Sequence, residues 1–214
     1  MKRLLVSWLW LLLFLSACGS AAETNLEGSD TLFHDEFVAG QTGSWVLEGD
    51  VAGRTSIVGE QLHIQVDAPA TMQFATLSEP TFTDFVLEVD ARQLAGDLQS
   101  SYGVLLRMQD AAHFYRFDIT GDGLYTVERR NGDGSWTRFV EDWTGTAAIN
   151  QGLSVVNRLR VEANGPTMRF YVNDTLLYQV TDGQYAGGTI ALDAGTFGQA
   201  GLEVAFDNVV VQQP

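Results

Sequence analysis

Hydrophobic and polar residues alternate in short runs along most of the chain. In the segments 61–66 and 85–90 every second residue is apolar, which is the period of a β-strand with one buried face. Apolar residues at helical spacing are almost absent. The same alternation predicts further strands at 33–38, 104–109, 114–119, 124–130, 135–141, 157–162, 167–172, 176–180, 189–193 and 203–211. The pattern therefore predicts roughly a dozen strands of ordinary length.

Glycine-containing turns separate these runs. Thr120–Gly123 and Arg130–Gly134 contain Asp-Gly and Asn-Gly pairs, which supply the positive φ angles of tight hairpins. We interpret 131–135 as a hairpin and not as a calcium loop, because an EF-hand beginning at Asn131 needs glycine where Trp136 stands. By length, residues 31–214 form one domain. The expected fold class is all-β, a two-sheet antiparallel β-sandwich of the jelly-roll type.

The first eighteen residues have the features of a lipoprotein signal peptide. Lys2 and Arg3 precede an almost wholly apolar run at 4–15, and Leu-Ser-Ala-Cys follows, ending at Cys18. This arrangement is a basic region, an apolar region and a small-residue cleavage site. Cys18 is the only cysteine, so we predict that it is lipidated. An ordinary secretory signal is the alternative. Lipidation would hold the protein on the outer face of the cell membrane or in the periplasm.

Composition narrows the classes of partner. Residues 19–30 are small and polar and are expected to be a flexible tether. The formal net charge is −15, and loss of Lys2 and Arg3 with the signal peptide makes it −17. So acidic a protein is not expected to bind nucleic acid, or to meet the membrane other than through its lipid. The charge suits neutral ligands.

Several segments together resemble a known family. In chain order they are FHDEF, the following Trp45, FVLEVDAR, YGVLLRMQD, HFYRFDITGDGLYTVERR, NRLRVEANGPTMRFYVND and VAFDNVVV. With these segments the chain is similar to the concanavalin A-like (LamG-like, glucanase-like) jelly-roll domains of bacterial secreted proteins and lipoproteins, among them relatives of the 3-keto-disaccharide hydrolase domain. The resemblance covers about residues 31–212 and implies an association with carbohydrate.

One of these segments bears on whether the protein cleaves glycosidic bonds. Laminarinase-type glucanases carry three acidic residues on one face of a strand, and EVDARQ resembles that motif with Glu88 and Asp90 in the first two positions. Arg92 stands in the third, and a guanidinium is no proton donor for glycoside cleavage. We therefore assign no catalytic residue. Carboxylates from other strands, such as Asp118 or Glu128, leave a catalytic alternative open.

The middle hairpins are rich in groups that bind sugars. Aromatic faces stack on pyranose rings, while charged and amide groups bond the hydroxyls. We expect a glycan platform on successive strands of this region. Its candidate residues are Arg107, Arg116, Asp118, Tyr125, Arg129, Trp136 and Trp143. The alternative is that the tryptophans pack in hairpins and the arginines pair with the abundant acids.

Metal sites have little support in the sequence. The three histidines are isolated, so the spacing of a zinc site is missing. In jelly rolls the first and last strands are commonly neighbours, which would bring Glu36 and Asp207 together as candidate ligands of a structural calcium ion. No cofactor is otherwise expected. Asp207 bonding backbone amides is the alternative to calcium.

The sequence thus predicts a lipid-anchored, extracytoplasmic jelly roll that binds carbohydrate and is not an enzyme. One alternative is a glycoside-cleaving enzyme of the 3-keto-disaccharide hydrolase type, with carboxylates that converge from separate strands. A second alternative is an adhesion or assembly module of the cell envelope that binds another protein.

Overall fold

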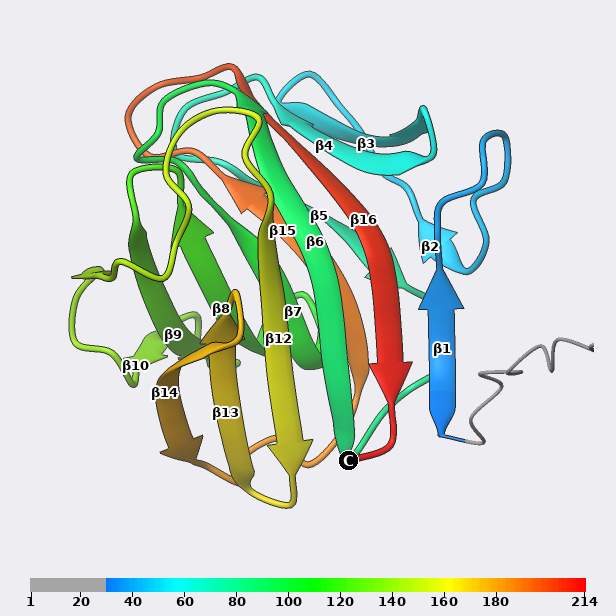
Figure 1. Ribbon diagram of the computed structural model, residues 1–214, viewed down its shortest axis with the longest axis vertical. Coiled ribbons are helices and arrows are strands. Elements are labelled where there is room, and N and C mark those ends of the chain that lie inside the picture. The colour runs from blue at the N-terminus through cyan, green and yellow to red at the C-terminus, as the bar shows by residue number, and fades with distance from the viewer. Residues whose placement is uncertain (1–29) are drawn as a thin grey trace, which may run out of the picture.

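The computed structural model describes residues 30–214. The predicted signal peptide, Cys18 and nearly all of the predicted tether lie outside this range. Within it, no helix is long and apolar enough to cross a membrane. The secondary structure consists of β-strands joined by turns and loops (Figure 1).

Two antiparallel sheets form the domain. Sheet A has the order β14-β13-β12-β6-β16-β4-β3, with β1 also paired to β16, and sheet B has the order β10-β9-β8-β7-β15-β5-β2, with β11 also paired to β9. The strands of sheet A are β1 (Thr31–Asp35), β3 (Gly53–Val58), β4 (Gln61–Val66), β6 (Phe85–Ala95), β12 (Asn157–Asn164), β13 (Thr167–Val172), β14 (Thr175–Thr181) and β16 (Leu202–Gln212). Those of sheet B are β2 (Trp45–Val46), β5 (Met72–Leu77), β7 (Ser101–Asp110), β8 (His113–Thr120), β9 (Leu124–Arg130), β10 (Trp136–Arg138), β11 (Thr144–Gly145) and β15 (Thr189–Gly195). This arrangement is the predicted sandwich.

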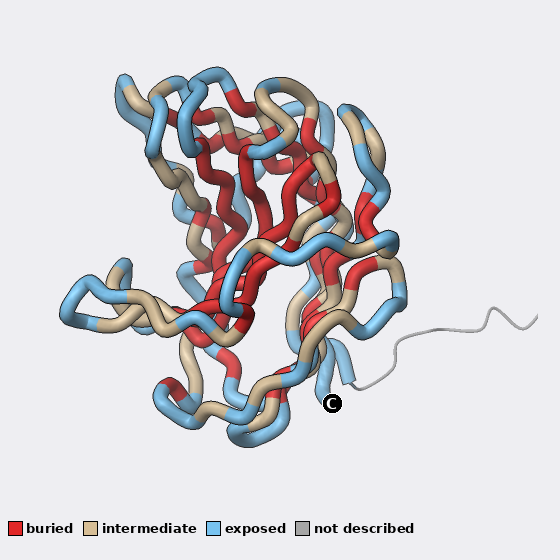
Figure 2. The backbone as a smooth tube through the Cα atoms, turned by 90° about the vertical axis from the view of Figure 1, so that its left-hand side faces the viewer, coloured by how far each residue is buried: buried red, intermediate tan, exposed pale blue. Residues whose placement is uncertain are grey.

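The main core lies between the sheets. In β6 the residues Phe85, Leu87, Val89 and Ala91 are buried and alternate with partly exposed polar or aliphatic ones, because successive side chains of a strand point to opposite faces. Sheet A therefore has one apolar face and one face toward solvent. The buried stretches run along the strands, and the exposed ones gather in turns and loops (Figure 2).

Strands β7 and β8 depart from this alternation. Every residue from Ser101 to Met108, and every residue from Phe114 to Thr120, is buried. Both faces of sheet B are thus covered around these two strands, one by the core and the other by side chains on its outer surface. Where both faces of a strand are buried in this way, hydrophobic and polar residues no longer alternate with a period of two in the sequence.

The first and last strands are neighbours, as expected. β1 pairs with β16 through Asp35 and Val209, and a bulge at Asn208, with φ 53°, changes the register of β16 against β6. Asparagine tolerates a positive φ better than most residues. Both the start of β1 and the end of β16 lie at the lower end of the sandwich in Figure 1.

Strand predictions were most accurate where alternation is clean. Strands β4, β6, β12 and β13 lie where the pattern predicts them, although β6 continues to Ala95. The expected strand at 135–141 is shorter, because β10 ends at Arg138. β3 and β5 were missed, since each mixes small, polar and apolar residues on both faces.

Gly103 is the position in sheet B that tolerates a side chain least. A Cβ atom there would lie 2.0 Å from the Phe117 carbonyl oxygen and 2.6 Å from Asp118 Oδ1. We predict that Gly103→Ala lowers the free energy of unfolding by about 1–3 kcal/mol or more, since overpacking forces a backbone shift. Gly198→Ala is the matched control, because a Cβ there meets nothing within 4 Å. Urea unfolding followed by circular dichroism measures both. Equal stability of the two variants would contradict the packing.

Candidate functional site

The outer face of sheet B divides into an apolar half and a polar half. The apolar half is a small cluster separate from the main core, with Leu105, Met108, Phe114 and Ala191 buried and Met72, Phe74 and Trp136 packed against them. The polar half lies on the same face, nearer the other ends of strands β7, β8, β9 and β15. It consists of Ser101, Arg116, Asp118, Thr120, Thr126, Glu128 and Asp193, all of them buried.

Arg116 lies at the centre of the polar half. Its Nε is 3.3 Å from Asp193 Oδ2, its Nη1 donates to Glu128 Oε1 at 3.1 Å, and its Nη2 donates to Ser101 Oγ at 2.8 Å and to Asp118 Oδ2. The guanidinium therefore bonds groups on β7, β8, β9 and β15. A planar, permanently charged fork of donors is suited to several acceptors at once.

The charges of this cluster do not balance. Three carboxylates surround one guanidinium, and Asp118 and Asp193 are 0 % exposed. Asp118 Oδ1 and Asp193 Oδ1 are also buried without a hydrogen-bond partner in the described structure. Unpaired buried charge is costly, so the neutral form of a carboxyl gains.

The pKa values of two of these acids reflect this imbalance. Burial raises the pKa of Asp193 well above its ordinary value, and the adjacent Asp118 charge raises it further, against the opposing effect of Arg116. Burial likewise raises the pKa of Glu128. Burial lowers the pKa of Arg116, but the three carboxylates outweigh it, and the net shift is upward. The carboxylates therefore favour the charged form of Arg116, while burial favours the neutral forms of Asp193 and Glu128.

A partly exposed aromatic pair lies at the end of the polar half. The rings of Trp143 and Phe197 pack edge to face with centroids 5.7 Å apart, and Phe197 is 49 % exposed. They line a pocket of about 330 Å³ together with Gln99, Thr120 and Leu124. Because Thr120 is on the same face of β8 as Arg116 and Asp118, the aromatic pocket and the polar half form one continuous surface.

The structure brings some of the predicted glycan-binding residues together. Arg116 and Asp118 are bonded to each other, and the Arg116 guanidinium carbon is 5.9 Å from the centroid of the Trp136 ring. Arg130 covers the same ring at 5.0 Å. Trp143 lies at the far end of the same surface, beside Thr120 in the aromatic pocket.

Three other predicted residues lie elsewhere. Arg107 is fully buried at a bulge of β7 with φ 47°, and it donates to the carbonyl oxygens of Thr83, Tyr185 and Gly165. It therefore holds loops together at one end of the sandwich. Burial lowers its pKa.

Tyr125 and Arg129 belong to the other face of β9. Tyr125 is part of the main core. Arg129 donates to Asp182 Oδ2 at 2.5 Å and lies 5.9 Å from the Tyr185 ring centroid. The arginines of the three successive strands therefore do not share a platform. Residues paired across two strands lie on the same face of the sheet, and Arg116 pairs with Glu128, whereas Arg129 pairs with Tyr115. Arg116 and Arg129 thus lie on opposite faces.

The EVDARQ segment is on the outer face of the opposite sheet. Asp90 accepts bonds from Arg158 Nε at 2.9 Å and Asn208 Nδ2 at 3.0 Å. Arg92 donates to Gln61 Oε1 at 2.5 Å. The pocket beside them has a volume of about 100 Å³, less than a typical small-molecule site. This strand therefore has a polar network in place of an acid triad.

The calcium candidates are held by other partners. Asp207 accepts from the backbone N–H of its neighbour Asn208 at 2.8 Å and from Gln61 Nε2 at 3.1 Å. Glu36 lies 3.4 Å from His34 Nε2. Among residues 30–214 no group of three or more His, Cys, Asp or Glu side chains is arranged to hold a metal ion. A structural calcium ion at Glu36 and Asp207 stays a prediction.

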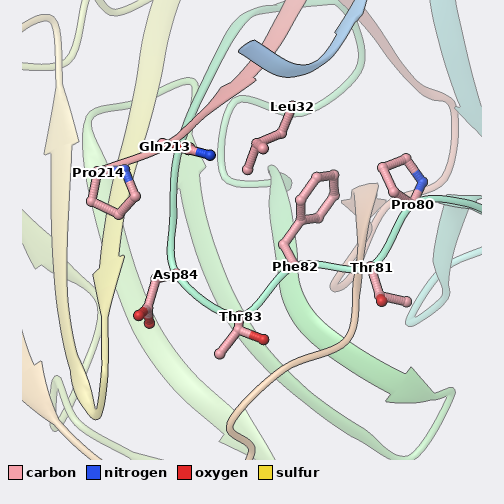
Figure 3. Close-up of a pocket in the computed structure, with 8 residues that line it drawn as sticks. All are labelled: Leu32, Pro80, Thr81, Phe82, Thr83, Asp84, Gln213 and Pro214. Carbon is pink, nitrogen blue, oxygen red and sulfur yellow. The ribbon is translucent and has the colours of Figure 1, made fainter. Parts of the chain in front are cut away.

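A third pocket lies at the end of the sandwich where the described chain starts and stops. It has a volume of about 460 Å³ and is lined by the start of β1, the segment between β5 and β6, and the last two residues (Figure 3). Leu32, Phe82 and Pro80 give it an apolar wall, and Asp84 contributes the one carboxylate of its lining. It is remote from the polar cluster on sheet B.

Asp193 and Phe197 are two members of the site that sequence reasoning missed, along with Gln99, Ser101, Thr120, Leu124 and Thr126. Asp193 stands in a continuous buried stretch of β15, and Phe197 follows in a loop. Neither position has a local signal, because both reach the site only through the pairing of β15 with β7. Two expected carboxylates, Asp118 and Glu128, do converge from separate strands.

The charge imbalance predicts how stability depends on pH. A carboxyl whose pKa is raised on folding binds its proton more tightly in the native state. Stability is then greatest below its ordinary pKa and falls as pH rises through the raised pKa. We expect Asp193→Asn to remove this loss, because the amide keeps an acceptor for Arg116 and donates to Asp118. Above pH 7 the variant should be more stable by about 1 kcal/mol or more.

Thermal unfolding from pH 4 to pH 9 tests this expectation. Asp207→Asn is the matched control, since that carboxylate is on the outer face of sheet A and only partly buried. If Asp193→Asn is less stable than the parent at every pH, Arg116 needs the charge of Asp193. That result would contradict the interpretation that ionisation of Asp193 lowers the stability of the fold at high pH.

Known folds of the same kind are found among solved structures. The carbohydrate-binding module CBM66 from Bacillus subtilis superposes with a TM-score of 0.63 at 19% identity, covering 79% of this chain and 96% of that one. The Bacillus licheniformis beta-glucanase has a TM-score of 0.61 at 12% identity, covering 88% and 99%. A Bacillus subtilis protein of unknown function with a galectin-like fold has a TM-score of 0.63 at 10% identity, covering 86% and 96%. At such identities these similarities establish the fold alone.

None of the curated proteins compared with this chain matches it. A family match does cover nearly the whole described domain, from residue 30 to residue 212. Together with the jelly-roll architecture, this match shows that the chain belongs to the 3-keto-alpha-glucoside-1,2-lyase-like domain family.

Proposed function

We propose that this domain binds carbohydrate on the outer face of sheet B and that it does so without cleaving it. The observation that carries the proposal is the Trp143–Phe197 pair, half-buried at Trp143 and exposed at Phe197, which lines a pocket of about 330 Å³ next to a row of polar side chains. Aromatic rings accept the apolar face of a pyranose, and neighbouring hydroxyls and amides fix its orientation. The exposed amide of Gln99 supplies such a group in the pocket.

The state of the carboxylates supports a binding role. Glycoside cleavage by paired acids needs two carboxyl groups that reach the scissile bond from opposite sides. Asp118 and Asp193 are 0 % exposed, and each contributes an oxygen to Arg116. A sugar seated on Trp143 would meet Thr120 before either acid.

Cleavage is the second candidate, and the same cluster favours it. The raised pKa of Asp193 and of Glu128 is a property that general acids need near neutral pH. A movement of Trp136 or Arg116 would be required to bring these acids to a substrate. Membership in a family described as lyase-like makes a 3-keto-α-glucoside the first substrate to test.

A panel of soluble polysaccharides and one 3-keto-α-glucoside, offered to residues 23–214, separates the two candidates. Retention of a glycan with no new reducing end supports binding alone. If the protein releases new reducing ends and Glu128→Gln does not, the domain is catalytic and the proposal of binding alone is wrong. No retention and no cleavage would move the search to protein partners.

The aromatic pocket gives the most direct test by mutation. We predict that Trp143→Ala and Phe197→Ala each weaken glycan binding about tenfold, because an aromatic contact is worth roughly 0.5–1.5 kcal/mol beyond its buried area and about 1.4 kcal/mol is tenfold. Tyr171→Ala on the outer face of sheet A is the control. Isothermal titration calorimetry measures all three. Full affinity in both pocket variants would exclude this pocket.

The proposal includes a lipid anchor at Cys18, which would hold the domain on the outer face of the cell membrane or in the periplasm. Residues 19–29 separate this cysteine from Asp30, a span of at most about 40 Å when fully extended. The described domain starts at the end of the sandwich opposite the Trp143–Phe197 pocket, since β6 and β16 run the length of the molecule between the two ends. An anchored domain would hold its pocket away from the membrane.

The anchor has its own test. We predict that Cys18→Ser moves the protein from the membrane fraction to the soluble one, and that mass spectrometry of the parent finds acyl chains on Cys18. Glycan binding of the soluble variant should be unchanged. Membrane association that survives Cys18→Ser would disprove anchoring through this residue.

A further inference from the structure

The segments around the aromatic pocket carry acidic side chains just outside its lining. The pocket residues Gln99, Leu124 and Trp143 come from the β6–β7 loop, the β8–β9 hairpin and the segment before β11. Each of these segments has an aspartate within two residues of the pocket, respectively Asp97, Asp122 and Asp142. We call these three aspartates the acidic rim.

Two members of the rim are fixed against the pocket by hydrogen bonds. Asp97 Oδ1 accepts from the backbone N–H of Gln99 at 3.1 Å. Asp122 Oδ1 accepts from the hydroxyl of Thr120 at 2.5 Å, and that same hydroxyl oxygen accepts from the N–H of Leu124 at 3.0 Å. Both carboxylates are thus one bond away from residues that line the pocket.

The rim is not neutralised by nearby cations. None of the described residues that line the pocket is charged. Arg138 lies 4.0 Å from Asp142, but their side chains are 61 % and 91 % exposed, and an ion pair so exposed and so long contributes little. Arg116, four residues from Thr120 on the same face of β8, is already surrounded by three carboxylates.

We propose that the Trp143–Phe197 pocket selects uncharged glycans and rejects polyanionic ones, and that Asp97, Asp122 and Asp142 determine this selectivity. The inference rests on the proposed function, because it assigns a substrate class to that binding site. A uronate or sulfate on a sugar held in the pocket would lie beside the segments that carry the rim. Repulsion between such like charges is stronger at low ionic strength and is screened as salt increases.

The experiment compares matched neutral and anionic glycans. Laminarin, dextran and soluble starch are titrated alongside their carboxymethylated forms, at about 20 mM and about 500 mM NaCl, which give strong and weak electrostatic effects respectively. We expect the neutral glycan that binds to do so at least about tenfold more tightly than its carboxymethylated form at low salt, and the ratio to fall several-fold at high salt.

The rim variant Asp97→Asn/Asp122→Asn/Asp142→Asn tests the assignment to these residues. Each asparagine keeps the acceptor oxygen that its aspartate uses, so the loops retain their hydrogen bonds. We expect this variant to lose most of the discrimination at low salt. The control Glu60→Gln/Glu79→Gln/Asp174→Asn changes the net charge equally at positions that do not line the pocket, and it should discriminate as the parent does.

The outcomes separate the two proposals. If no neutral glycan binds at either salt concentration, the proposed function fails and the inference fails with it. If neutral and carboxymethylated glycans bind the parent equally at low salt, the site stands and the selectivity is disproved. If the control loses discrimination as fully as the rim variant, overall charge governs selectivity and the three rim residues do not.

Discussion

The outer face of sheet B depends on a single buried cation. Arg116 bonds Ser101, Asp118, Glu128 and Asp193, so four strands meet at one guanidinium. A buried ion pair is often no more stabilising than apolar packing, but removal of one partner leaves an uncompensated charge. The contribution of Arg116 is therefore better described as one of specificity. It links β15 to β7, β8 and β9 in a register that keeps every acid within its reach.

The surroundings of this cation follow from the same constraint. A carboxylate on each neighbouring strand needs space, and Gly103 on β7 provides it, since any Cβ there would crowd Asp118. The apolar cluster around Phe114 and Trp136 covers the other half of the face. Water is thereby kept from the ion cluster on that side, which strengthens its electrostatic interactions and raises the cost of its surplus negative charge.

The fold could be predicted from the sequence because its signals are local. The alternation in β4 and β6 and the Asp-Gly turn after Thr120 each indicate structure within a few residues. The site could be predicted only in part. Arg116, Asp118 and Trp136 lie on strands joined by hairpins, so their proximity follows from short-range register. Asp193 joins them through a pairing across more than seventy residues, for which no local pattern exists.

The misplaced residues illustrate the same limit. Arg107 resembles Arg116 in its strand context, yet a bulge turns its side chain to the carbonyl oxygens of Thr83 and Gly165. A bulge depends on how two strands fit each other, and sequence alternation alone does not reveal it. Arg129 directly follows Glu128 on β9, and a shift of one position along a strand moves the side chain from one face of the sheet to the other.

The aromatic pocket and the ion cluster around Arg116 differ in how readily a ligand can reach them, and this difference bears on the proposed function. Trp143 and Phe197 line an open pocket at the edge of the sandwich, whereas Asp118 and Asp193 are covered completely. A glycan can therefore bind at the aromatic end with no rearrangement, while cleavage by these acids requires the ion cluster around Arg116 to open. Opening would expose the surplus charge to water and remove the burial that raises the pKa of Asp193. Binding is thus the activity that we propose for the ground-state geometry, and catalysis by these acids would have to be driven by the energy of contacts that form only with the true substrate.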